Sequence, residues 1–324
     1  ATTTLGTAKA YSGGTTILSG IVNINSNNAF GTGTVTMTGG AIRATNAPRT
    51  IGNNLLISGT VGFGFATNLT GSVTLAGDTS ITPSGNFGNS RWSGPLNLNT
   101  HTLSTSNTGP NVKGGSWNGQ TLNLSGVISG SGDIVHNAGT GTLLLSGANT
   151  YTGATTVSAG TLRAGSATAF GSNSAVTANA TLDLNGFDIS IGSLTGGGTV
   201  TNSTTATTTL TTGGNNLLRT FSGVIQNGSG ITRLTKIGTG KQSLSGTNTY
   251  TGATTVEAGT LRVTVAGVLG SGLYSGAIAI SDGASFDYLS SAAQTLSGDV
   301  SGDGNLTKDV SATSTLILSG NNTY

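Results

Sequence analysis

The sequence predicts an all-β protein whose short strands coil in one sense as a parallel β-helix, that is, a solenoid. Three observations predict this fold class: the composition, a repeated motif, and strand-like alternation within that motif. Gly makes up 55 of the 324 residues, whereas charged residues are 7% and hydrophobic residues 34%. Gly, Thr, Ser and Asn are poor helix formers, and Thr and Val in alternation suit strands. A chain with so few large apolar side chains must bury small ones in regular layers.

The composition also argues against several classes of function. The absence of cysteine excludes a disulfide framework and a thiolate metal site. A net charge of +2 built from few charges argues against a nucleic acid partner, and no apolar run approaches the length of a membrane span. The ten acidic residues show no spacing typical of a calcium loop or a glycosidase pair, and no serine-hydrolase elbow is present. We therefore expect a protein that is not an enzyme, with no catalytic residue, no cofactor and no metal ion.

One motif recurs along the chain. It reads LSGANTYTGATTVSAGTLRAG from Leu145 and LSGTNTYTGATTVEAGTLRV from Leu244, opens again from Leu318, and has a degenerate copy from Leu5. Measured from each of the first three anchoring tyrosines, Thr follows after four residues, Gly after nine and Phe or Leu after nineteen. We assign structural roles to these repeat-defining residues: Tyr11, Tyr151, Tyr250, Tyr324, Gly20, Gly160, Gly259, Phe30 and Phe170.

Each motif predicts short strands joined at corners. In TTVSAGTLRA, the side chains of Val157, Leu162 and Ala164 point to one face, and Gly160 lies between two runs where a corner needs a residue without Cβ. The intervals between successive anchoring tyrosines are unequal, although the local register is constant, so whole coils are added or lost. With coils of about 20–25 residues, we expect one continuous solenoid over 1–324, irregular near 78–120, as a segment of a longer chain.

Both tryptophans lie in the irregular stretch near residues 78–120. An exposed indole face suits the apolar face of a sugar ring, so Trp92 and Trp117 are candidate glycan contacts. They also begin two similar segments, WSGPLNL and WNGQTLNL, whose separation in the sequence is close to one expected coil. Solenoid register then predicts a second arrangement, in which the two rings stack on neighbouring coils as an aromatic ladder. Of the two, we favour the ladder.

The charged residues are interpreted as surface groups. Asp183 in TLDL and Asp287 in SFDY occupy equivalent places in two repeats, and a carboxylate that recurs with the repeat is expected to face outward and aid solubility. Several basic residues crowd one part of the chain, and we interpret them as a solvated face rather than a contact for an anionic glycan: Arg219, Arg233, Lys236 and Lys241.

The blocks GTGTLLLSGANTYTGATTVSAGTLRAG and FSGVIQNGSGITRLTKIGTGKQSLSGTNTYTGATTV resemble the passenger-associated β-strand repeats of bacterial autotransporter proteins. The resemblance covers most of residues 1–65 and 121–324. It implies a right-handed β-helix displayed on, or released from, the surface of a Gram-negative bacterium. The family usually has a Lys after its GSG element, which Lys236 and Lys308 match, whereas residues 133–136 (DIVH) depart from the pattern. The signal peptide and the C-terminal membrane barrel of a full autotransporter are not in this sequence.

These observations favour a structural function: a stalk, adhesin or extracellular fibre segment outside the cell. The two ends lack a capping element and leave open strand edges, so we expect the stack to be completed either by neighbouring sequence of a longer chain or by other copies of the chain, stacked end to end as partners. A surface glycan or matrix component is a second kind of expected partner, whereas nucleic acid is not. The alternative is a glycan-binding or polysaccharide-degrading β-helix with its site near 78–120.

Overall fold

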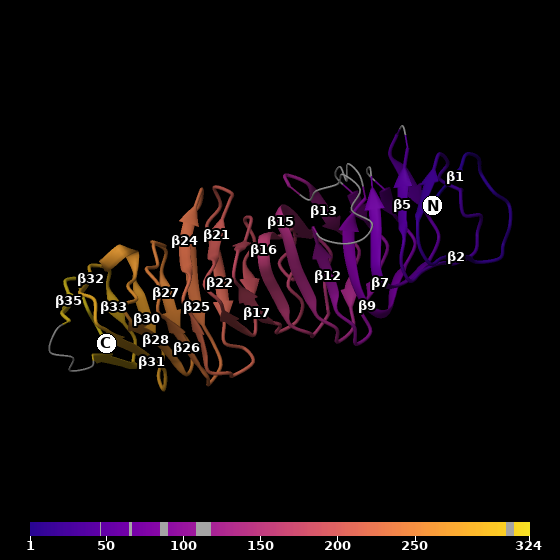
Figure 1. Cartoon of the computed structure of the whole chain (residues 1–324). Helices are drawn as coiled ribbons and strands as arrows, with labels where there is room; N and C mark the ends of the chain where they lie inside the picture. Colours follow the sequence, from indigo (N-terminus) through magenta and orange to yellow (C-terminus); the bar gives the residue numbers. More distant parts are fainter. Residues whose placement is uncertain (46, 65–66, 85–89, 108–117, 309–313) are drawn as a thin grey trace. The chain divides into compact units, whose positions relative to one another are not determined.

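The computed structural model describes residues 1–45, 47–64, 67–84, 90–107, 118–308 and 314–324. Almost all regular structure in these ranges is β-strand, with one short 3₁₀ turn at Gly270–Gly272. The strands of successive coils pair in parallel, residue on residue, as in a β-solenoid (Figure 1). The predicted fold class, all-β with a parallel β-helix, is confirmed. Its right-handed sense stays a prediction from the resemblance.

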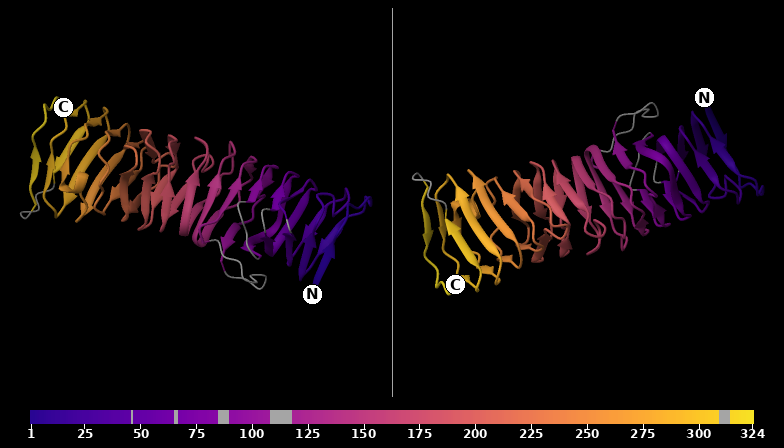
Figure 2. Two further views of the ribbon diagram at one scale, coloured as in Figure 1. Left: turned by 90° about the horizontal axis from the view of Figure 1, so that it is seen from above. Right: turned by 90° about the horizontal axis from the view of Figure 1, so that it is seen from below.

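The chain forms two compact units, residues 1–171 and 172–324. Figure 2 shows, from two further directions, the strands of neighbouring coils side by side within each unit. The strands of the first unit are β1 (Thr2–Leu5), β2 (Thr15–Ile17), β3 (Ile21–Ile24), β4 (Val35–Met37), β5 (Ala41–Ala44), β6 (Arg49–Ile51), β7 (Leu55–Gly64), β8 (Thr67–Leu69), β9 (Val73–Pro83), β10 (Ser90–Trp92), β11 (Leu96–Asn97), β12 (Leu103–Ser106), β13 (Thr121–Leu124), β14 (Ile128–Ser129), β15 (Ile134–Leu145) and β16 (Thr155–Ala164).

Coil length in the first unit is close to the expected value, with one exception. Thr2 pairs with Ile21 and Ile21 with Ala41, so each of these coils has the length of a short solenoid repeat. Ser90, however, pairs with Leu122, so that coil is much longer than the others and includes most of the irregular stretch. The stretch near 78–120 is therefore built into the solenoid by its strands β9 to β12, and its extra residues lie within one long coil.

The second unit continues the same construction. Its strands are β17 (Ala175–Ala178), β18 (Thr181–Asp183), β19 (Ile189–Ser190), β20 (Ser193–Thr195), β21 (Thr199–Asn202), β22 (Thr208–Thr212), β23 (Arg219–Phe221), β24 (Val224–Gly228), β25 (Thr232–Lys236), β26 (Lys241–Leu244), β27 (Thr254–Val256), β28 (Thr260–Val265), β29 (Leu273–Tyr274), β30 (Ile278–Ile280), β31 (Ser285–Ser290), β32 (Gln294–Leu296), β33 (Val300–Ser301), β34 (Asn305–Lys308) and β35 (Leu316–Leu318). One sheet contains β22, β25, β27, β30 and β33, and another contains β23, β26, β28, β31 and β34.

The core consists of stacked columns of inward side chains. Because parallel strands pair in register, like residues lie above one another: Leu122 pairs with Leu143 and Leu143 with Leu162, and all three are fully buried. Thr and Ser fill other inward positions, such as Thr155 and Thr254, where no large apolar side chain is present. A low hydrophobic content is enough because each coil buries its residues against two neighbours.

The repeated Leu-Ser-Gly element forms a column of its own. The Ser125 N–H donates to the carbonyl of Trp92 in the preceding coil, at 2.7 Å, and the Ser146 N–H donates to that of Leu124, at 2.8 Å. The next residue is glycine because a Cβ on Gly126 would lie 1.9 Å from the carbonyl oxygen of Gly94. A Cβ on Gly147 would likewise lie 2.1 Å from the carbonyl oxygen of Gly126. The motif recurs where a coil approaches its predecessor this closely.

Candidate functional site

Two of the anchoring tyrosines are fixed in the interior. Tyr151 and Tyr250 are fully buried, and each hydroxyl is bonded to the threonine four residues later, Thr155 at 2.7 Å and Thr254 at 2.8 Å. Burial raises the pKa of both phenols, that of Tyr250 to about 12, so both stay neutral at physiological pH. The buried hydroxyl pair explains the four-residue spacing of the motif, because each hydroxyl satisfies the other.

The other repeat-defining residues are distributed as follows. Phe30 and Phe170 are each 1% exposed, whereas Tyr11 and Tyr324 are 42% and 52% exposed. All three glycines have positive φ, at corners where a side chain would be strained: Gly20, Gly160 and Gly259. These residues thus shape the coil and do not form a cluster of chemical groups.

Trp92 lies in the core and does not present a face to a sugar. It is 1% exposed and packs edge-to-face on Phe63, with ring centroids 5.1 Å apart. Its Cα partner in the next coil is Leu124, because that coil is longer than the separation of the two tryptophans in the sequence. The glycan-contact interpretation of Trp92 is therefore wrong for this structure. Trp117 lies outside the described residues, so the predicted aromatic ladder of Trp92 and Trp117 stays a prediction.

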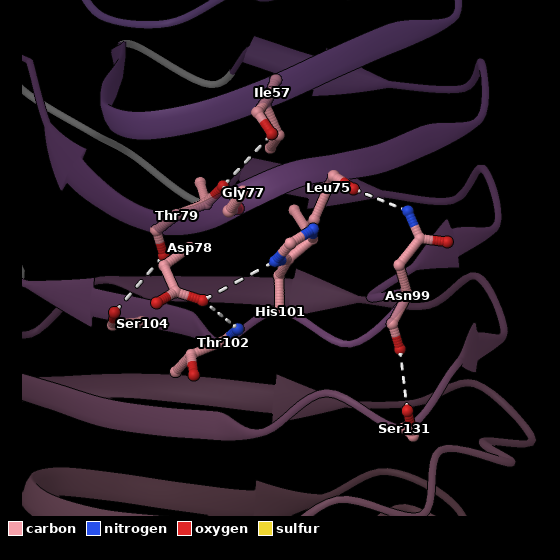
Figure 3. A network of polar contacts seen from close by, with 10 residues as sticks. All are labelled: Ile57, Leu75, Gly77, Asp78, Thr79, Asn99, His101, Thr102, Ser104 and Ser131. Atoms are coloured by element: carbon pink, nitrogen blue, oxygen red, sulfur yellow. Dashed lines mark hydrogen bonds and ion pairs between the residues drawn. The ribbon is translucent and has the colours of Figure 1, made fainter.

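The acidic residues join one coil to the next. Asp78, in the stretch proposed for a glycan-degrading site, accepts the Thr102 N–H at 2.9 Å, and its carboxylate is 3.9 Å from His101 Nδ1 (Figure 3). Four more carboxylates accept a backbone N–H about one coil further on, at 2.7 to 3.1 Å: Asp133, Asp183, Asp188 and Asp299. Other hydrogen bonds near Asp78 also join neighbouring coils; for example, Asn99 Nδ2 donates to the Leu75 carbonyl at 2.7 Å.

This use of carboxylates corrects the interpretation of Asp183 and Asp287 as solvated groups. Asp183 is 1% exposed and Asp287 7%. Asp287 accepts hydrogen bonds from Arg262 at 2.8 and 3.1 Å and from Ser285 at 2.6 Å. Repeating carboxylates are buried here because they satisfy backbone or guanidinium donors, which offsets the cost of removing them from water.

Two inward-facing basic residues form matching sites, one in each unit. Lys236 is fully buried, which corrects its assignment to a solvated face, and its ammonium donates to the carbonyls of Ile237, Gly238 and Ala258 at 2.6, 2.7 and 3.0 Å. Burial lowers its pKa to about 8. Alternation could have revealed the burial, because Lys236 is in phase with the buried Leu234.

His136 occupies the place of Lys236 in the first unit. Each residue pairs with a valine that comes directly before a corner. His136 pairs with Val157, which precedes Ser-Ala-Gly, and Lys236 pairs with Val256, which precedes Glu-Ala-Gly. The imidazole is fully buried, its Nε2 3.1 Å from the Gly141 carbonyl oxygen and its Nδ1 2.7 Å from Thr105 Oγ1. Residues 133–136 therefore differ from the family pattern in residue type, but His136 still places a hydrogen-bonding nitrogen beside a corner carbonyl, as Lys236 does in the second unit.

The structure contains a concave surface that the sequence did not predict, here called the arginine groove. It is a cavity of about 400 Å³ in the first unit, lined by Ser90, Arg91, Thr121, Asn123, Leu144 and Arg163. Four of these residues form one outward column across β10, β13, β15 and β16, since Arg91 pairs with Asn123, Asn123 with Leu144, and Leu144 with Arg163. The described residues that line it include two arginines.

Metal and membrane sites were also considered over the ranges that the structure describes. Nowhere in them do three or more His, Asp or Glu side chains gather as metal ligands. The described ranges contain no helix with the length and apolar character of a membrane-spanning segment.

Parallel coils built on a repeated motif define this chain as a repeat β-solenoid. A family model described as the passenger-associated-transport-repeat matches residues 1–24, 138–164 and 234–263. These three segments are similar to that repeat, which confirms the resemblance found in the sequence. The adhesin BmaC autotransporter of Brucella suis biovar 1 (strain 1330) is 38% identical over 147 residues, which is 44% of this chain and 4% of the adhesin. The match thus spans a small part of that relative. No solved structure matches the chain.

Proposed function

We propose that this chain is a non-catalytic solenoid segment of an autotransporter adhesin passenger, displayed on or released from the surface of a Gram-negative bacterium. The observation that carries the proposal is the coincidence of passenger repeats with 38% identity to an autotransporter adhesin. The stacked coils support it physically, because a solenoid is stabilised by neighbour-to-neighbour contacts and presents a long lateral surface for binding.

The non-catalytic part of the proposal rests on the contacts of the acids. Glycoside hydrolysis needs two carboxylates facing a substrate across a cleft. In residues 78–120, Asp78 is the only acid, and it is bonded to the Thr102 N–H of the next coil. This arrangement favours an adhesin over a polysaccharide-degrading β-helix.

Surface display is tested with antibodies raised against the purified chain. We expect them to label intact cells of the bacterium that carries the gene, and protease added outside the cells to remove the label. Purified chain added in excess is expected to compete with the cells for adhesion to host tissue. Labelling that appears only after the cells are permeabilised would contradict the proposal.

End-to-end association is a further part of the proposal. The first strand, β1, pairs with β3 and keeps Thr2, Thr3 and Thr4 exposed, and β35 pairs with β32. A strand at the edge of a stack offers backbone N–H and C=O groups to a second copy. Electron micrographs of the purified chain at micromolar concentration are expected to show filaments, and particles of single-chain size at every concentration would overturn this part.

A further inference from the structure

We propose that a cavity beside Asn53, here called the Asn53 cavity, binds one ring of a neutral sugar. The cavity lies at a corner of the coil in the first unit. The proposal rests on the proposed adhesin function for its biological setting only. The binding itself is argued from the cavity, from the hydrogen bonds of Asn53 and from a comparison with the equivalent corner of the second unit.

The Asn53 cavity has a volume of about 260 Å³. The described residues that line it all lie outside the strands: Asn28, Gly31, Thr32, Gly52 and Asn53. They come from two successive coils, because Val35, shortly after the first three, pairs with Leu55, shortly after the last two. Ligand sites for drug-sized molecules have volumes of about 300–1,000 Å³. This cavity is therefore of a size for a single sugar ring rather than for a longer oligosaccharide.

Asn53 offers a hydrogen-bond acceptor to the cavity. Its side chain is 7% exposed, and its Nδ2 donates to the carbonyls of Gly31 and Gly33 at 3.1 and 2.7 Å, which fixes the amide. Two other buried amides, those of Asn149 and Asn248, also accept a backbone N–H at Oδ1, at 2.9 and 3.0 Å. The described residues supply no such donor to Asn53 Oδ1. A buried acceptor favours a ligand that donates a hydrogen bond to it.

The equivalent corner of the second unit is filled by a side chain. Leu55 in the first unit and Leu194 in the second each pair with the first valine after a Phe-Gly corner. Three residues before Leu55 is Gly52, whereas three residues before Leu194 is Ile191, which is 1% exposed. A Cβ on Gly52 would meet Thr70 Oγ1 at 3.8 Å, an ordinary van der Waals distance. The glycine is thus not required by close packing at this place, and it leaves space at the mouth of the cavity.

The chemistry of the lining suits a neutral sugar. Asn28 and Thr32 are exposed, and an amide and a hydroxyl can each donate and accept hydrogen bonds. Gly31 and Gly52 carry no side chain, so a ligand can approach their backbone closely. Sugar hydroxyls also donate and accept, so they match Asn53 Oδ1 together with these groups. The five residues are uncharged, which favours a neutral sugar over a charged one.

An NMR titration of the whole ¹⁵N-labelled chain with the methyl glycosides of galactose, mannose and N-acetylglucosamine tests the proposal. We expect at least one glycoside to give saturable shifts of the Gly31 and Gly52 backbone signals and of the Asn53 side-chain amide. A dissociation constant of about 1 mM is expected, because one ring makes few contacts.

Three variants locate the binding. Thr32→Val and Asn28→Ala each remove one exposed hydrogen-bonding group, so we expect binding about fivefold weaker in each. Gly52→Ile introduces the residue of the other corner, so we expect it to fill the cavity and abolish saturable binding. The matched control is Thr239→Val, because Thr239 is an exposed corner threonine of the second unit. This control is expected to bind like the wild type.

Several results would overturn the proposal. They are the absence of a saturable shift with all three glycosides, shifts confined to residues outside the Asn53 cavity, unchanged affinity in Thr32→Val and Asn28→Ala, and an equal loss in Thr239→Val. Thermal melting of each variant separates loss of binding from loss of folding, and the two exposed substitutions keep the test decisive if Gly52→Ile unfolds. Sugar binding by the purified chain is independent of surface labelling, so failure of either proposal is visible separately.

Discussion

Replacing Gly126 with alanine is expected to destabilise the first unit by about 3 kcal/mol or more. The added Cβ would lie 1.9 Å from the carbonyl oxygen of Gly94 and 2.5 Å from its carbonyl carbon. Both are backbone atoms, so no side chain can rotate away. Relief requires the two coils to separate, and that separation would stretch the hydrogen bonds that the Ser125 and Gly126 N–H groups donate to the Trp92 carbonyl, at 2.7 and 3.1 Å.

Urea unfolding followed by circular dichroism measures this effect. The matched control is Gly13→Ala, because a Cβ on Gly13 meets no atom within 4 Å and its φ is not in the positive range. We expect the control to unfold at the wild-type urea concentration or slightly above it, since alanine restricts the unfolded chain more than glycine does. Equal midpoints for Gly126→Ala and the wild type would mean that the coils are not packed as closely as described.

The coil and its corners could be predicted because they depend on local residue types that recur. The Asn-Thr-Tyr element shows the reason for the recurrence. Asn149 accepts the Ile128 N–H of the preceding coil at 2.9 Å and donates to the Ala169 carbonyl of the following one at 2.8 Å. At that corner a backbone N–H and a backbone carbonyl find their partner in a side chain. Asn recurs there because its amide side chain can bond to both groups.

The arginine groove could not be predicted in this way, because it depends on which residues of different coils share a column. Equal coil lengths would pair Trp92 with a residue about 20–25 positions further on, but the long coil pairs it with Leu124. The same long coil brings Arg91 into one column with Arg163. Neither arginine belongs to a motif of charged residues in the sequence, and only the register of the strands joins them.

The burial of His136 and Lys236 could be predicted only in part. Alternation places His136 in phase with Ile134, and Lys236 in phase with Leu234, so both positions are inward by pattern. For Lys236, its charge suggested the opposite, a solvated face. The structure resolves the conflict because the corner carbonyls supply hydrogen-bond acceptors inside the coil, which a buried polar group requires.

Acid is expected to destabilise the first unit through His136. Burial lowers the pKa of this imidazole from 6.5 to about 4, and the hydrogen bond to the Gly141 carbonyl offsets only part of that effect. The Cα partners of His136 in the neighbouring coils are Thr105 and Val157, neither of which can ionise near neutral pH. A neutral ring with its proton on Nε2 donates to Gly141 and accepts from Thr105, so the native contacts need no charge.

The direction of the change in stability with pH depends on whether the folded or the unfolded chain binds more protons. Between pH 6.5 and about 4 the unfolded chain holds a proton on His136 that the folded chain does not, so stability falls as the pH is lowered through this window. The loss is about 3 kcal/mol when the pH reaches 4, at 1.36 kcal/mol per pKa unit. Above pH 6.5 this residue contributes no pH dependence.

Unfolding in urea at a series of pH values from 7.5 to 4 is the measurement, with two variants beside the wild type. His136→Gln keeps a donor and an acceptor but cannot become charged, so we expect its stability to lose most of this dependence on pH. His101→Gln is the control, because His101 is partly exposed, with 34% of its side chain accessible, and it should keep the wild-type acid sensitivity. If the His101 variant loses the sensitivity and the His136 variant retains it, then the buried imidazole is not the group that limits stability in acid.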